Sequence, residues 1–334
     1  MTSYAVVIPT LVRDTLADCL AALAAANGPR PDEMVLVDDR PGAAPDPEAL
    51  GHALSVLGHL RERATVLAGG GHGPAAARNT GLRAVTTPWV VFLDEDVQVG
   101  PHWYTQLVRD LTEASPDTAG VQGVITVPLP EGRRPTDWER GTARLARARW
   151  TTADMAYRTE ALKQVGGFDE RFTRAFREDA DLALRLLGAG WRIRRGHRTT
   201  LHPVRPASRW ASVGQQRGNA DDALMRRLHG PDWWDKAVAP RGRIRRHAAI
   251  TAAGTAACVL GATGHRRAAA VCALGWAAGT AEFARARIVA GPRTRDEVTT
   301  VLATSVAIPP AATWYRMAGA WRHRNAPVRR EVTR

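Results

Sequence analysis

The chain has 334 residues, enough to bury a full hydrophobic core and, at the usual domain size, to form about two domains. Its composition of 45% hydrophobic and 24% charged residues excludes wholesale disorder. The net charge of +13 would suit nucleic-acid binding, but it comes almost wholly from arginines spread along the chain. No nucleic-acid-binding motif accompanies these arginines, so we expect no nucleic-acid partner.

Three cysteines, an odd number, show no metal-ligand spacing, and the first residues pass directly into a strand pattern without a signal peptide. These two features favour a reduced protein that faces the cytosol.

The first hundred residues alternate between apolar, strand-like runs and helical patterns. Helices are predicted over 15–27, where apolar residues recur with a period of 3.6, and after Pro74, which suits a first helical turn. The predicted strands are 5–9, 33–39, 63–68 and 88–94. Continuously apolar strands separated by helices predict an α/β fold with a mostly parallel sheet flanked by helices.

Two acidic clusters follow these strands, and ligands bind at the carboxyl ends of parallel strands. Asp38 and Asp39 end the second strand, and Asp94, Glu95 and Asp96 follow the fourth. We expect the clusters to converge on one edge, where a divalent cation would balance their charge. Mg²⁺ or Mn²⁺ binds through carboxylates and phosphate oxygens and would neutralise a leaving diphosphate. A solvated turn is the alternative for the Asp-x-Asp pattern alone.

The middle of the chain interrupts the alternation with an arginine-rich insertion over 129–150. Order resumes with a helix over 177–190, and a further helix is predicted over 208–229. Glu178 and Asp179 fall on the first turn of the former helix. The helix dipole favours carboxylates there and is expected to keep Asp179 ionised.

The last hundred residues contain three alanine-rich apolar runs flanked by arginines: 248–263, 268–281 and 298–314, the third broken by Pro309 and Pro310. Each is shorter than the roughly 20 strongly apolar residues of an unambiguous spanning helix. We expect helices that lie on, or dip into, the cytosolic leaflet of a membrane. A soluble helical bundle packed on the catalytic domain is the alternative.

Several enzyme classes are disfavoured by missing motifs. The sequence PTLVRD after the first strand is not the Gly-x-Gly-x-x-Gly of a dinucleotide dehydrogenase, and GGGHGPAAARNTG lacks the Lys-Ser/Thr of an ATPase phosphate loop. No Ser/His/Asp or Cys/His arrangement is evident.

The order VVIPT, VLVDD, GPAAARNTGL, PWVVFLDEDV, ADMAYRTEALKQVGGFDERF and REDADLALRL resembles the family 2 glycosyltransferases with the GT-A fold, over roughly residues 4–230. The resemblance is to an actinobacterial type with a C-terminal apolar helical region. It implies a GT-A catalytic domain over 1–230, whereas the helical, membrane-associated region expected over 231–334 rests on the apolar runs alone. It also implies an inverting, metal-assisted enzyme of the hexosyltransferase type that uses a nucleotide-diphospho-sugar donor.

The resemblance assigns roles to individual positions. Asp179 would be the general base for the acceptor hydroxyl, with Glu178 orienting it or contacting the acceptor. The metal ligands would be Asp96 and, where many GT-A enzymes place a further ligand, His202, for which a purely structural role is the alternative. The remaining positions would contact the nucleotide-sugar, with the role of Glu95 the least defined: Pro9, Thr10, Asp38, Asp39, Arg78, Asp94, Glu95, Gly166 and Gly167.

One departure bears on processivity. Processive relatives carry a Gln-x-x-Arg-Trp motif, whereas the nearest candidate here, VGQQRGNADDAL, lacks the tryptophan and the spacing. We therefore expect transfer of a single sugar to a hydroxyl. From the C-terminal apolar runs we expect an envelope glycan or lipid-linked acceptor, at the cytoplasmic face of the plasma membrane. A soluble cytoplasmic location is the alternative. The competing functions are a sugar-phosphate nucleotidyltransferase and a non-catalytic membrane scaffold with a transferase-like domain.

Overall fold

The computed structural model describes residues 2–42 and 50–329. Within them the chain forms two compact units. The first contains the residues up to 128 together with 144–203, and the second contains 129–143 and 204–329. A functional boundary at residue 230 stays a prediction.

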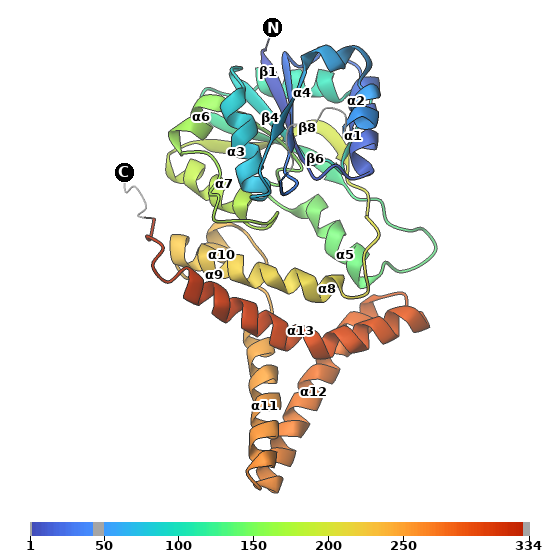
Figure 1. Ribbon diagram of the computed structural model, residues 1–334, viewed down its shortest axis with the longest axis vertical. Coiled ribbons are helices and arrows are strands. Elements are labelled where there is room, and N and C mark those ends of the chain that lie inside the picture. The colour runs from blue at the N-terminus through green and yellow to red at the C-terminus, as the bar shows by residue number, and fades with distance from the viewer. Residues whose placement is uncertain (1, 43–49, 330–334) are drawn as a thin grey trace. The chain divides into compact units, whose positions relative to one another are not determined.

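The first unit is built on an eight-stranded sheet with the order β3-β2-β1-β4-β7-β6-β8-β5 (Figure 1). Its parallel half agrees with the predicted strands to within one or two residues. It consists of β1 (Tyr4–Thr10), β2 (Glu33–Asp38), β3 (Ala64–Ala68) and β4 (Trp89–Leu93). Every residue of β4 is buried, as expected for a strand covered on both faces.

The other half of the sheet is mixed, and the parallel pairing that the sequence predicts recurs there between β6 and β8. β7 (Asp154–Arg158) runs antiparallel to β4, and β6 (Thr118–Thr126) runs antiparallel to β7. β8 (Arg192–Leu201) is parallel to β6, and the two-residue β5 (Gln98–Val99) is antiparallel to β8. The pairing partners lie far apart in sequence, which local hydrophobic patterns cannot specify.

Helices of the first unit form as their sequences predict. α1 (Thr15–Ala25) buries the predicted apolar face of Leu16, Cys19, Leu20 and Leu23. α3 (Pro74–Ala84) begins at the expected proline, and α7 (Glu178–Gly188) begins at Glu178. The other helices of this unit are α2 (Gly51–Ser55), α4 (Trp103–Thr112) and α6 (Thr159–Gln164), with 3₁₀ turns at Gly58–Arg63 and Arg144–Arg147.

A buried ion network ties β8 to its neighbours. Arg198 on β8 is fully buried, and its guanidinium lies 3.1 Å from Asp110 on α4 and 2.7 Å from Asp154 on β7. Asp154 also accepts hydrogen bonds from the Trp103 indole and the Thr200 hydroxyl. Satisfied in this way, the three buried charges fix the course of β8 towards residue 202.

The second unit is helical. The insertion supplies α5 (Asp137–Ala143), and the chain continues through α8 (Ala211–Gly214), a 3₁₀ turn at Gln215–Arg217, α9 (Gly218–His229) and α10 (Trp233–Lys236). α11 (Ile244–Ala262) and α12 (Arg266–Ala290) form a hairpin, and α13 (Arg295–Arg322) packs against α9 and the base of that hairpin (Figure 1).

A buried arginine, Arg287 of α12, joins three segments of the second unit. Its guanidinium donates to Asp137 at 2.8 Å and to the hydroxyls of Thr304 and Ser305 on α13 at 2.9 Å. The insertion is therefore anchored to the helical unit by a charge-assisted contact that its sequence does not reveal.

The prediction that Pro309 and Pro310 break the third apolar run is wrong. α13 is helical over 28 residues and contains Pro309 and Pro310 in its interior. Two successive prolines remove two intrahelical N–H donors. Packing of the buried face of α13 compensates, since Ile308 and Ala312 on either side are buried. Among the residues described, none of the helices reaches the length and hydrophobicity that a membrane-spanning segment needs.

Candidate functional site

The two acidic clusters meet at the carboxyl edge of β2, β1 and β4, as the sequence predicts. Thr10, the last residue of β1, pairs in register with Asp38 at the end of β2. The Thr10 hydroxyl donates to Glu95 Oε2 at 2.5 Å. Each cluster is therefore in contact with the same strand end.

Glu95, the middle carboxylate of its cluster, organises the loop after β1. Besides the Thr10 hydroxyl, it accepts the backbone N–H groups of Leu11 and Arg13, and it pairs with the Arg13 guanidinium. Within this loop Val12 has a left-handed backbone, with φ at 56°. Such a conformation persists only where the surroundings impose it. The role of Glu95 that the structure shows is to hold this loop.

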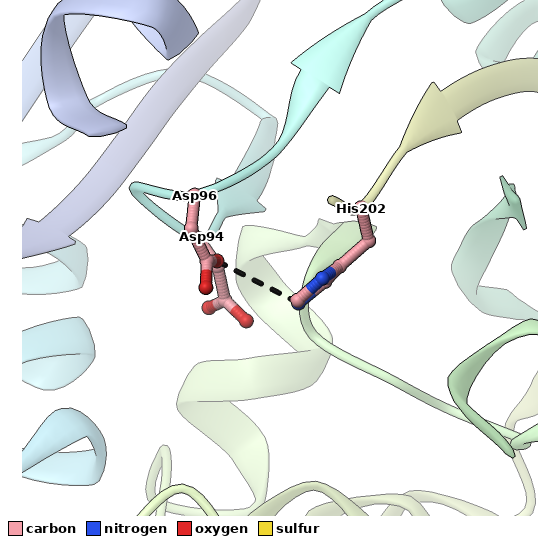
Figure 2. Close-up of side chains that lie close together, drawn as sticks. All are labelled: Asp94, Asp96 and His202. Carbon is pink, nitrogen blue, oxygen red and sulfur yellow. Dashed lines mark ion pairs between the residues drawn. The ribbon is translucent and has the colours of Figure 1, made fainter. Parts of the chain in front are cut away.

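Asp94, Asp96 and His202 form a cluster suited to a metal ion (Figure 2). Asp94 and Asp96 follow β4 and His202 follows β8, and one ligand atom from each lies within 4.8 Å of the others. His202 Nε2 is 3.6 Å from Asp96 Oδ1, and both side chains are more than 90% buried. Two carboxylates and an imidazole fit Mn²⁺ or another divalent cation of intermediate hardness. Asp94, predicted only as a sugar or ribose contact, lies among these possible ligands.

Arg78 connects this cluster to the start of α7. Its side chain is 2% exposed, and its two terminal nitrogens bind different carboxylates: Nη2 lies 2.8 Å from Asp94 and Nη1 lies 2.9 Å from Glu178. The guanidinium also lies over the Phe168 ring, 5.5 Å from its centroid. The structure therefore shows Arg78 bridging two carboxylates, and contact with the nucleotide stays a prediction.

Glu178 and Asp179 occupy the first turn of α7, as predicted, but their surroundings oppose ionisation. Burial, followed by the charge of Asp179, raises the pKa of Glu178 well above the usual carboxyl range. Burial also raises the pKa of Asp179, despite the hydrogen bond that Asp179 accepts from the Ala180 N–H. Desolvation thus acts against the helix dipole at Asp179, and the expectation that the helix start keeps this carboxylate ionised stays a prediction.

The other two acidic candidates are held by different partners. Asp38 is buried, and its carboxylate accepts hydrogen bonds from Nε and Nη2 of Arg40. Although burial acts to raise the pKa of Asp38, the Arg40 hydrogen bonds outweigh it and lower that pKa. Asp39 accepts the backbone N–H groups of 71–73, which fixes the glycine-rich loop before α3.

The predicted pocket loop at Gly166 and Gly167 is pinned by Asn79 of α3. The Asn79 amide accepts from the Phe168 N–H and donates to the Phe168 carbonyl. Gly167 has φ at 71°, and a Cβ there would lie 2.6 Å from the Asn79 oxygen, so only glycine fits. Pro9 lies within β1, paired in register with Val37.

Sequence reasoning missed three contributors: Arg13, Asn79 and Arg40. Arg40 follows Asp39 and Asn79 follows Arg78 in the sequence, so their positions gave a weak indication that they belong to the site. Nothing local indicates that Arg13 reaches a carboxylate 82 positions later.

The family model "Glycosyl transferase family 2" matches residues 5–181, which is more than half of the chain. Two curated relatives from strains of Mycobacterium tuberculosis, both named pre-mycofactocin glycosyltransferase, are 36% identical to it over 136 residues. The match covers 36% of this chain, which thus spans only 28% of the length of these relatives.

Among solved structures, the fold is similar to that of a mannosyltransferase from Pyrobaculum calidifontis, solved in complex with GDP-mannose and Mn²⁺. The TM-score is 0.57 at 20% sequence identity, and the superposition covers 94% of this chain and 86% of the other. The likeness establishes the GT-A type of fold, with its mixed sheet flanked by helices and a helical C-terminal region. The motifs, the fold and the family match agree: this chain belongs to glycosyl transferase family 2.

Proposed function

We propose that this protein is an inverting glycosyltransferase that moves one sugar from a nucleotide-diphospho-sugar to an acceptor hydroxyl, assisted by a divalent metal ion. The observation that carries the proposal is the continuous chain of contacts from the candidate metal cluster to the candidate base. Asp94 belongs to the metal cluster and binds Arg78, which binds Glu178, the neighbour of Asp179.

The proposed reaction uses Asp179 as general base. Its carboxylate removes the proton of the acceptor hydroxyl as that oxygen attacks the anomeric carbon. The bond to the nucleotide diphosphate breaks on the opposite face, which inverts the configuration. A metal ion held by Asp94, Asp96 and His202 would neutralise charge on the leaving diphosphate. Burial raises the pKa of Asp179, and a higher pKa makes its carboxylate a stronger base.

The test is a screen for Mn²⁺-dependent hydrolysis of UDP-, GDP- and dTDP-sugars, followed by transfer to candidate acceptors. The relatives' names add pre-mycofactocin to an acceptor panel of envelope glycans and lipid-linked acceptors. We expect one donor class to be turned over, with product of inverted anomeric configuration by NMR. Pyrophosphate released from a nucleoside triphosphate and a sugar phosphate, without donor turnover, would contradict the proposal.

Metal removal gives a further prediction. Chelation with EDTA should abolish transfer, and Mn²⁺ should restore it. His202→Ala removes one proposed ligand and should raise the half-saturating Mn²⁺ concentration at least about tenfold, since even outer-shell changes weaken metal sites by roughly that factor. His102→Ala, at an exposed histidine outside the cluster, is the matched control. Equal Mn²⁺ dependence in both variants would remove His202 from the metal site.

The proposal also includes single-sugar transfer at the cytosolic face of the plasma membrane, to an envelope glycan or a lipid-linked acceptor. The absence of the processive motif from the sequence 213–224 supports the first part. The apolar runs of the C-terminal helices support the second.

A further inference from the structure

Helix α13 has apolar side chains on two opposite faces. The inner face is buried and includes Val301, Ile308 and Ala312. The opposite face is exposed, and its side chains recur every three or four positions, which aligns them along the helix. We call this row the outer stripe, and it consists of Leu302, Val306, Pro310, Trp314, Met317 and Trp321.

The outer stripe is unusually exposed for its composition. Trp314, Met317 and Trp321 are 67%, 64% and 69% exposed, and no charged residue occurs between Glu297 and Arg316. Over 19 residue steps the stripe extends about 28 Å along the helix. Apolar surface of this continuity, exposed on a folded helix, marks a site of protein or membrane interaction.

The stripe continues onto the helical hairpin. An apolar groove of about 450 Å³ lies between α12 and α13, with Leu302 and Val306 on one side and Ala277 and Ala281 on the other. Further along α12, Leu274 is 70% exposed. Residues 248–264 and 268–281 of the hairpin carry no charge, so the uncharged surface extends over both hairpin helices.

Positive charge surrounds this surface. Residues 241–324 contain thirteen arginines and three carboxylates. Ten of these arginines are exposed near the ends of the three helices or at the hairpin turn, outside the outer stripe: Arg241, Arg245, Arg246, Arg266, Arg267, Arg285, Arg293, Arg295, Arg322 and Arg324. An apolar surface bordered by cations and tryptophans complements the acyl chains and phosphates of an anionic bilayer.

We propose that the outer stripe, the α12–α13 groove and the hairpin form a surface that binds a bilayer containing anionic phospholipid. The inference rests on the proposed function's placement at a membrane and identifies the residues that make the contact. The tryptophans lie at the headgroup level, and the arginines bind phosphate. A second copy of the chain is a poorer occupant, because a symmetric contact would bring the same arginines together.

The experiment is flotation of the full-length protein with vesicles of phosphatidylcholine, with or without phosphatidylglycerol. We expect binding to the anionic vesicles that weakens with salt. Trp314→Glu combined with Met317→Glu should lower the partition coefficient at least about tenfold, because it places charge in the apolar contact. Arg266→Gln combined with Arg267→Gln should lower it by about fivefold for each arginine.

The matched control adds the same two charges at exposed apolar positions outside this surface, in Leu187→Glu combined with Val328→Glu. It should bind vesicles as the unaltered protein does. The proposal is overturned if the unaltered protein does not bind anionic vesicles. It is also overturned if the control loses binding as completely as the stripe variant, Trp314→Glu combined with Met317→Glu. Light scattering that shows a dimer dissolved by the stripe variant, without vesicle binding, would identify a second copy as the occupant.

Donor hydrolysis without vesicles separates this inference from the proposed function. The stripe variant should retain hydrolysis of the free donor, because the metal cluster and Asp179 are unchanged. Vesicle binding without any donor turnover would contradict the proposed function but support the membrane-binding surface. Donor turnover without vesicle binding would overturn the membrane-binding surface and leave the proposed function standing.

Discussion

Asp179→Asn is expected to lower kcat/KM for sugar transfer by about 10²–10⁴-fold, the contribution typical of a positioned general base. The amide is nearly isosteric but cannot accept the proton of the acceptor hydroxyl. Donor affinity, measured by calorimetry with a non-hydrolysable analogue, should change little, because the metal cluster keeps its ligands. The loss should therefore appear in kcat rather than in donor binding.

Asp117→Asn is the control for this change. Asp117 is half-exposed on the first unit, where it pairs with Arg192 outside the candidate site. Its replacement should leave kcat/KM unchanged. Full transfer activity in Asp179→Asn would eliminate Asp179 as the base and leave the proposed mechanism without one.

The pH profile gives a second measurement of the same residue. The base must be deprotonated, so transfer is lost as the pH falls through the pKa of Asp179. Because burial raises that pKa, the acid limb of kcat/KM should lie above the value of about 3.9 for an ordinary aspartate. The limb should vanish in Asp179→Asn. An acid limb that persists unchanged in the variant would assign the titration to another group.

Arg78→Met is expected to lower the free energy of unfolding by about 3–5 kcal/mol, the usual effect of breaking a buried ion pair. It leaves Glu178 buried and Asp94 partly buried without the shared guanidinium. Urea denaturation followed by circular dichroism measures the loss. Arg78→Lys should recover only part of it, because one ammonium cannot reproduce the two-nitrogen bridge.

Two comparisons make the Arg78 result interpretable. Arg83→Met, on the same helix but 66% exposed, should change stability by less than about 1 kcal/mol. Combining Arg78→Met with Glu178→Gln should restore part of the stability, since the uncompensated carboxylate is removed. Equal losses for Arg78→Met and Arg83→Met would show that the bridge does not stabilise the fold.

Local sequence determined much of the architecture. The four N-terminal strands, the buried face of α1 and the start of α7 at Glu178 follow from hydrophobic period and helix-start signals. These signals act over a few residues, so one sequence suffices to read them. The convergence of Asp38 and Asp94–Asp96 also followed, because parallel strands bring their carboxyl ends to one edge.

Tertiary structure decided how the side chains of the site are partnered. That Glu95 holds the loop of Arg13, and that Arg78 joins Asp94 to Glu178, depends on pairs 16 to 100 positions apart. Burial made these pairings necessary, because a charge removed from water must find a counter-charge or lose its proton. For the same reason the raised pKa of Asp179 could not follow from its place on a helix, since desolvation depends on what the rest of the chain packs around it.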